Sequence, residues 1–468
     1  MPCSDVIVEY IIGSSSQNCR DKYKLLLISP AIMHTAGLHL RKKVTVFRFD
    51  NALQGTIKTM RASKLLAPVF NSIMLRNRTL FAVSLAVCTA YTGIGMVVPV
   101  RVLYAQAHGA SLAIISAMAS AYLVSNFMAQ YPVGWLADRW GRKQLILIGL
   151  LVQAALSLAY LLLVDPLSFV LVRFLEGIAG AAVLLPARAL IADAVPLEKR
   201  GEAYGVYNSF FNAAFLFGPA LGGLLAATGY ATAFIGAIIF RLVAVPVVIT
   251  MIRTEHRPDA VTRERAASVP RRALFTLPLV GAYILAFGDY LYLGFELALL
   301  PLWIHYHLGA SVSVIGLIFA ISAIPIILLS PISGRIADRS RRSVLILTFG
   351  LGMVPLYISY GLSNSILLVI GLYAVHGTIF AIVQPAVDAH VAASSPPNAR
   401  GRVQGMYTTI GLASAFIGSI GLTFLYGVNF RLPLFTLAIV VSVCVLVGGT
   451  MVRISEKRGL VSISKKDH

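Results

Sequence analysis

Charged residues inside apolar stretches are the features of this sequence with the clearest chemical consequence. Arg173 and Glu176 lie three residues apart in one such stretch; Asp289 and Glu296 lie seven apart in another, with Tyr292 between them. On a helix these spacings place side chains on one face. A charge inside a membrane is costly, and such residues usually bind a substrate or carry protons. These side chains could therefore hold a cation, or take up and release a proton.

Simpler structural roles also fit these charged residues. Arg173 and Glu176 could neutralise each other and only order their helix, and Glu296 could reach water at the membrane surface. Two further arginines lie in apolar stretches. We expect Arg101 to extend outward to the surface and Arg241 to pair with an acid.

Uncharged polar residues at helical spacing indicate a central cavity for a small-molecule substrate. They are Tyr122, Asn126, Gln130, Asn208, Asn212, Tyr373, His376 and Gln384. Amide side chains also form hydrogen bonds between membrane helices, so each could have that role instead. The four cysteines show neither a disulfide framework nor the spacing of a metal site, and we predict no metal.

The composition requires elements that cross a membrane. Of 468 residues, 58% are hydrophobic and 12% charged, whereas soluble domains carry about 25% charged residues. About 20 apolar residues are needed to cross the hydrocarbon as a helix, and twelve such stretches occur, apolar throughout rather than alternating as in barrel strands. The predicted spans are 80–104, 112–135, 144–164, 167–192, 204–227, 231–252, 274–304, 312–334, 343–362, 365–392, 404–427 and 431–452.

An internal repeat divides these spans into two sets of six. GWLADRWGRK at 134–143 recurs as GRIADRSRRS at 334–343, and Gly109-Ala110-Ser111 recurs at 309–311 with the same offset. Repetition of helical halves is one plan of membrane transporters. We therefore predict an all-α membrane protein with two pseudo-symmetric six-helix bundles. The expected organisation is a basic tail (1–78), a first bundle (79–252), a linker (253–273), a second bundle (274–452) and a second tail (453–468).

The net charge of +20 is unevenly distributed along the chain. Lys and Arg crowd the tails and every second connection, whereas the intervening connections near 105–111, 165–166, 228–230, 305–311 and 363–364 carry none. The positive-inside rule then predicts that both termini are cytoplasmic. A basic membrane face suits anionic lipids, so we expect lipid partners and a plasma-membrane location, and no nucleic-acid partner.

The first copy of the repeat resembles the signature loop of the major facilitator superfamily. This resemblance implies that the loops latch the cytoplasmic ends of the two halves and release them during the transport cycle; a tight turn with orienting charges is the alternative. The implied gate residues are Gly134, Asp138, Arg139 and Arg142 in the first copy, and Gly334, Asp338 and Arg339 in the second. The second copy departs from the pattern at Arg341 and Ser343.

Two further motifs resemble those of proton-coupled drug exporters in this superfamily. Arg173-x-x-Glu176-Gly177 is similar to an Arg-x-x-Gln-Gly motif linked to proton coupling, with Glu176 replacing Gln. The run 218–223, GPALGG, is similar to the antiporter motif, although Ala214 stands where a glycine is customary. Proline bends a helix and glycines admit a close neighbour, so the run could act as a sealing hinge. Its predicted gate residues are Gly218, Pro219, Gly222 and Gly223.

The sequence thus predicts a secondary active transporter, most simply a proton-coupled exporter of a small amphipathic or cationic compound. Arg173, Glu176 and Asp289 would couple protons, and Asp289, Tyr292 and Glu296 would meet the substrate. We expect a monomer without a cofactor, driven by the proton gradient. One alternative is a sugar or metabolite symporter or uniporter on the same fold. Another is a transport-inactive sensor or assembly partner. No nucleophile–base constellation, phosphate loop or zinc spacing indicates an enzyme.

Overall fold

The computed structural model describes residues 77–195, 200–252, 271–396 and 399–459. All of them belong to one compact unit, which runs from Leu65 to His468. The predicted first tail, apart from residues 77 and 78, lies outside the described residues. So do most of the predicted linker and the end of the second tail.

Twelve helices in the described ranges are long and apolar enough to cross a membrane, which confirms the predicted number. The first six are α3 (Arg78–Ala107), α4 (Leu112–Trp140), α5 (Arg142–Leu162), α6 (Pro166–Ala194), α7 (Arg200–Ala226) and α8 (Tyr230–Met251). The others are α9 (Leu277–Ala298), α11 (Val312–Arg339), the pair α12 (Arg342–Gly350) and α13 (Met353–Leu362), α14 (Ile366–Ser394), α15 (Arg400–Val428) and α16 (Leu432–Lys457).

Two predicted spans are less regular than expected. The stretch 274–304 is divided into α9, the short α10 (Leu300–Leu302) and a π-helical turn at Trp303–His307. Pro301 lies at this break, and proline cannot donate the backbone hydrogen bond that a continuous helix requires. The ninth span is interrupted at 350–352, where two glycines lower helix propensity.

The repeated Gly-Ala-Ser element is explained by how α4 and α11 begin. Gly109 and Gly309 have φ angles of 88° and 65°, a left-handed conformation that glycine adopts without steric cost. Ser111 and Ser311 then accept hydrogen bonds from the backbone N–H groups of Ile114 and Val314. These side chains satisfy donors that the first helical turn leaves without partners.

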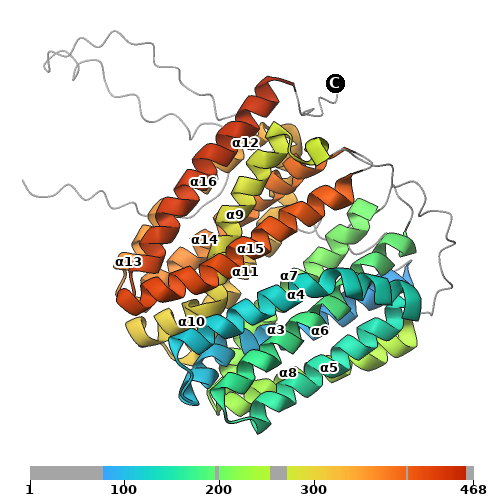
Figure 1. Ribbon diagram of the computed structural model, residues 1–468, viewed down its shortest axis with the longest axis vertical. Helices are drawn as coiled ribbons and strands as arrows, with labels where there is room; N and C mark the ends of the chain where they lie inside the picture. Colours follow the sequence, from blue (N-terminus) through green and yellow to red (C-terminus); the bar gives the residue numbers. More distant parts are fainter. Residues whose placement is uncertain (1–76, 196–199, 253–270, 397–398, 460–468) are drawn as a thin grey trace, which may run out of the picture. The chain divides into compact units, whose positions relative to one another are not determined.

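Corresponding helices of the two halves pack in the same way, as the pseudo-symmetry predicts (Figure 1). In the first half, α3 packs on α7 and α8, and α4 packs on α6. In the second half, α9 packs on α15 and α16, and α11 packs on α14. The chain therefore forms two six-helix bundles of one design.

The two bundles meet through α4 with α15 and α7 with α11. Ser116 and Ser120 of α4 form hydrogen bonds of 2.9 and 2.8 Å to the backbone oxygen and the hydroxyl of Ser419, and Ser313 donates to the Gly223 oxygen at 2.9 Å. We call this contact the seam; it lies where α4 and α11 begin. These three hydrogen bonds join the two bundles there. The repeated loops lie at the opposite end of the helices.

Candidate functional site

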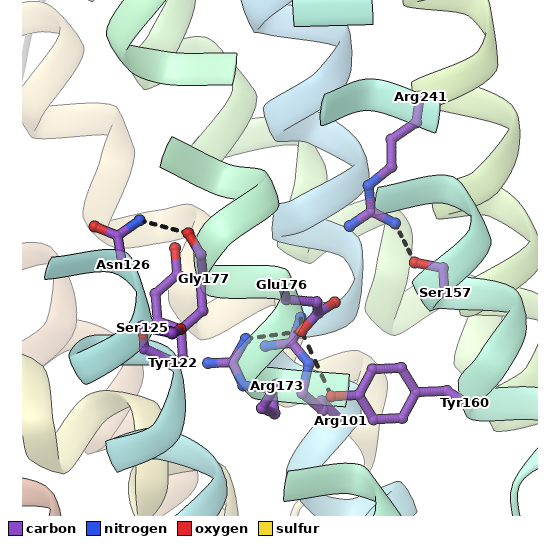
Figure 2. A network of polar contacts seen from close by, with 10 residues as sticks. All are labelled: Arg101, Tyr122, Ser125, Asn126, Ser157, Tyr160, Arg173, Glu176, Gly177 and Arg241. Carbon is purple, nitrogen blue, oxygen red and sulfur yellow. Dashed lines mark hydrogen bonds and ion pairs between the residues drawn. The ribbon is translucent and has the colours of Figure 1, made fainter. Parts of the chain in front are cut away.

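A cluster of charged side chains is buried in the first bundle (Figure 2). One carboxylate oxygen of Glu176 lies 2.9 Å from Nη1 of Arg173 and 3.6 Å from Nη2 of Arg101. The Tyr160 hydroxyl donates to the same oxygen at 3.5 Å. The two arginines and the glutamate are each 4–6% exposed. We call these four residues the arginine cluster.

Helices α4 and α6 approach closely beside this cluster because residue 177 is glycine. A Cβ atom on Gly177 would lie 2.9 Å from the backbone nitrogen of Asn126. The Asn126 amide donates to the Gly177 oxygen at 3.0 Å, so it has the helix-to-helix role left open above. The Arg173 guanidinium lies 4.2 Å from the ring centre of Tyr122, a favourable cation–π distance. The structure thus brings two predicted cavity residues to the charged pair.

The two other intramembrane arginines differ from their predicted environments. Arg101 does not extend outward, so that prediction is wrong: it is 6% exposed and directed at Glu176 (Figure 2). An acid within reach inside the bundle compensates its charge better than a distant surface. Arg241 is 1% exposed and donates to the Ser157 hydroxyl. In the described part of the chain no ion pair with an acid forms there, contrary to our expectation.

The second bundle holds acids next to aromatic rings. Asp289 and Glu296 on α9 are half-buried, and neither forms an ion pair within the described ranges. The Tyr292 hydroxyl lies 2.6 Å from that of Tyr373, and its ring centre lies 4.6 Å from that of His376. Together with Tyr357 and Tyr360, these three residues form what we call the aromatic cluster. Glu296 interacts electrostatically with all four of its tyrosines.

Sequence reasoning missed Asp388 on α14. Its carboxylate is exposed and accepts a hydrogen bond of 3.0 Å from Gln384, a predicted cavity residue. Asp388 also interacts electrostatically with Asp289. The signal was present in the sequence, because an acid four residues after Gln384 lies on the same helical face.

The remaining predicted cavity residues join neither cluster. Gln130 donates to the Asn126 side chain at 3.3 Å. Asn208 is exposed on α7 and Asn212 is half-buried one turn further along. Both lie nearer the end of the repeated loops than GPALGG does.

The first repeated loop is bound to its own half. Arg142 forms an ion pair with Asp193 of α6. Lys143 donates to the backbone oxygens of Ile249 and Ile252 at 2.7 Å each, and so caps the end of α8. These contacts fix the loop to α6 and to the end of α8.

The other predicted loop residues lie in varied surroundings. Arg139 lies over the Trp135 ring at 5.3 Å, and Asp138 is exposed. A Cβ on Gly134 or Gly334 would find open space. The side chains of Asp338 and Arg339 lie outside the described residues.

The GPALGG run of α7 packs against both bundles. A Cβ on Gly218 would lie 2.7 Å from the Thr92 oxygen, and one on Gly222 would overlap the backbone of Met96, both on α3. A Cβ on Gly223 would lie 2.8 Å from the oxygen of Val312 on α11. Pro219 lies between them inside α7. The run therefore joins the first helix of its own half to the seam.

Two pseudo-symmetric bundles with buried charges between apolar spans are the architecture of a secondary membrane transporter. The chain belongs to the Major Facilitator Superfamily, whose sequence profile matches residues 83–300 and 282–467. It is 24% identical to an uncharacterised MFS-type transporter of Methanocaldococcus jannaschii, over 74% of this chain and 91% of that one. It is 22% identical to Multidrug resistance protein 2 of Bacillus subtilis, over 71% of this chain and 86% of that one.

A shorter match, 24% identical over 45% of this chain and 56% of the relative, is to the quinolone resistance protein NorA of Staphylococcus aureus. Among solved structures, a bacterial homologue of the human lysosomal transporter Spinster, inward-facing and unoccupied, superposes with a TM-score of 0.63 at 16% identity, over 81% of this chain and 97% of that one. A D-xylose–proton symporter superposes with a TM-score of 0.61 at 17% identity, over 83% and 98%. The chain is thus an integral membrane transporter of this superfamily.

Proposed function

We propose that this transporter exports small amphipathic or cationic compounds in exchange for protons. The observation that carries the proposal is the pair of intramembrane acids, Asp289 and Glu296, beside the aromatic cluster. Neither acid has a basic ion-pair partner in the described ranges. Acids inside a membrane without such partners are suited to bind a cation or a proton. The drug-resistance names of two relatives support export of such compounds.

The aromatic cluster suits the organic part of a cationic substrate. Ring faces attract cations and also pack against apolar groups. Tyr292 connects the two features, because its ring belongs to the cluster and it shares the helical face of Asp289 and Glu296. A cation held by the acids would therefore be close to the rings.

Proton coupling is proposed for Asp289 together with Arg173 and Glu176. The carboxylate of Glu176 contacts two guanidinium groups, which favour its charged form. Asp289 has no comparable cation among the described residues, so it is the better carrier of the proton. In this scheme the Arg173–Glu176 pair senses the charge of the cavity, and a proton and a cationic substrate compete for Asp289.

Alternating access is proposed to occur by breaking and remaking the seam. The bundles are joined by hydrogen bonds at the seam, while Gly134, Gly205 and Gly405 near the other end have open space at their Cβ positions. The similarity to an inward-facing structure supports an opening toward the repeated loops. In this proposal that end, and both termini, lie on the cytoplasmic side of the plasma membrane, as the positive-inside rule favours for the basic loops. The GPALGG run and the loop residues would act as gates.

The proposal is tested with purified protein in proteoliposomes, using ethidium as a cationic probe and an imposed pH gradient. Wild-type protein should move ethidium against the proton flow. Asp289→Asn should abolish this proton-driven movement, because an amide cannot release a proton. Asp165→Asn is the control: Asp165 caps α6 through its side chain, and Asn caps equally well. Undiminished proton-driven transport by Asp289→Asn would refute the coupling role.

A proton symporter is the second candidate, favoured by the shared fold of the D-xylose–proton symporter. The same proteoliposomes distinguish the two, because a symporter moves its substrate in the direction of proton flow and an antiporter moves it the opposite way. Uptake of D-xylose along the proton flow, with no movement of ethidium, would favour the symporter.

A further inference from the structure

The interior of the first bundle contains more positive than negative charge. Arg101, Arg173 and Arg241 are all at most 6% exposed, whereas Glu176 is the one acid buried to that degree in the described residues. The bundle interior therefore has a surplus of two positive charges. Buried charge is destabilising unless an opposite charge accompanies it. Cation–π contacts with Tyr122 and Tyr160 offset this surplus only in part.

Hydrogen-bond donors are in surplus as well. Each guanidinium has five N–H donors. The acceptors that these three arginines contact are one oxygen of Glu176 and the Ser157 hydroxyl. The Nε atom of Arg101 is buried without a hydrogen-bond partner. The cluster is thus built to accept a further anionic group.

A small pocket adjoins these donors. Arg101 and Arg173 form its charged wall, and the rest of the lining is apolar, including Met118 of α4 and Leu297 of α9. Arg241 is not part of the lining. Leu297 belongs to α9, the helix of the second bundle that also carries Asp289 and Glu296, although neither acid lines the pocket. The pocket itself thus presents donors for an anion within an otherwise apolar lining.

We propose that this pocket is an anion subsite that binds a carboxylate through Arg101 and Arg173. Guanidinium groups bind carboxylates by paired, charge-assisted hydrogen bonds. The carboxylate comes either from the transported compound, which is then a zwitterion, or from a free small carboxylate bound with it. This inference rests on the proposed export function only for the location of the cationic group.

Binding is tested by the thermal stability of the purified protein at constant ionic strength, with benzoate and its uncharged isostere benzamide as probes. Benzoate should raise the melting temperature and benzamide should not. Arg101→Gln should abolish the benzoate shift. Arg241→Gln, which removes the same charge from the same bundle outside the pocket lining, should keep it. If Arg101→Gln cannot be purified, Arg101→Lys serves instead. It should weaken the binding of benzoate at least about tenfold, because Lys lacks the planar, forked guanidinium group that binds both carboxylate oxygens.

The proposal is overturned if benzoate gives no shift in the wild type, if benzamide gives an equal one, or if the benzoate shift survives in the Arg101 variant. The source of the carboxylate is decided in proteoliposomes with norfloxacin, a zwitterion, and its methyl ester, which keeps the amine. Preference for norfloxacin by about tenfold or more assigns the carboxylate to the transported compound. Ester transport that requires added benzoate assigns it to a free anion. Equal transport of both compounds, unaffected by benzoate, overturns the subsite.

The two proposals fail separately. Ethidium carries no carboxylate, so its proton-driven export tests the exporter function without the subsite. A benzoate shift in a protein that does not move ethidium would support the anion subsite and refute the exporter function. Ethidium export without a benzoate shift would support the exporter function and refute the anion subsite.

Discussion

Replacing Glu176 by Gln should strongly destabilise the first bundle. The substitution keeps the shape of the side chain but removes the single negative charge among three buried arginines. In the wild type, one oxygen of Glu176 lies within 2.9 and 3.6 Å of two guanidinium groups. Removing one partner of a buried ion pair costs about 3–5 kcal/mol. We expect a loss near the lower limit, because the Gln amide oxygen still accepts one hydrogen bond.

The measurement is the free energy of unfolding in mixed micelles titrated with sodium dodecyl sulfate, followed by tryptophan fluorescence. The double variant Arg173→Met/Glu176→Met should be more stable than Glu176→Met alone, because it restores the wild-type net charge of the interior. Asp193→Asn is the control, since its ion pair with Arg142 is partly exposed and such pairs contribute about 0–1 kcal/mol. A Glu176→Gln protein within about 1 kcal/mol of wild type would refute this account of the arginine cluster.

Three other substitutions test the packing and the seam. Gly222→Val should abolish transport and lower the melting temperature, because its side chain would overlap the backbone of Met96. In Ser120→Cys/Ser419→Cys, whose native hydroxyls lie 2.8 Å apart, oxidation should form a disulfide that stops ethidium transport, and reduction should restore it. Tyr292→Phe and Tyr373→Phe should each cost about 0.5–1.5 kcal/mol of stability. The double variant should cost little more than either single one, because both remove the same 2.6 Å hydrogen bond.

Each of these three tests has its own control. Gly205→Ala should be tolerated, since its Cβ would meet no atom within 4 Å. Either single cysteine variant should transport equally well with and without oxidant. If transport by a single variant were sensitive to oxidant, the loss in the double variant could not be assigned to a disulfide across the seam. Additive losses in the two tyrosine variants would mean that the hydroxyls act independently.

Most of the fold could be predicted from the sequence, because the length of each apolar stretch and the internal repeat can be read directly from the order of the residues. The twelve spans and their duplication follow from runs of apolar residues and from the recurrence of the Gly-x-x-Ala-Asp-Arg core. The interruptions at 299–303 and 350–352 also lie at Pro and Gly residues visible in the sequence. Whether such a residue interrupts the helix depends on the neighbouring helices, and the sequence alone does not show which helices those are.

The candidate site could be predicted only in part. Arg173 and Glu176 were recognisable as a pair because they are three residues apart on one helix. Arg101 was assigned the wrong environment, because its acid lies 75 residues away in the sequence and on another helix. Likewise, Ser157 could not be named as the partner of Arg241, since a hydroxyl partner has no charge that would single it out.

The small side chains of the seam determine how much energy is needed to open it. Four serine hydroxyls form its three hydrogen bonds between the bundles. In membranes such bonds average about 0.6 kcal/mol each, so the three together contribute roughly 2 kcal/mol. One elementary charge that crosses a potential of 100 mV releases about 2.3 kcal/mol. In the proposed exchange with protons, the polar part of the seam is therefore weak enough for the electrical work of a single proton to break it.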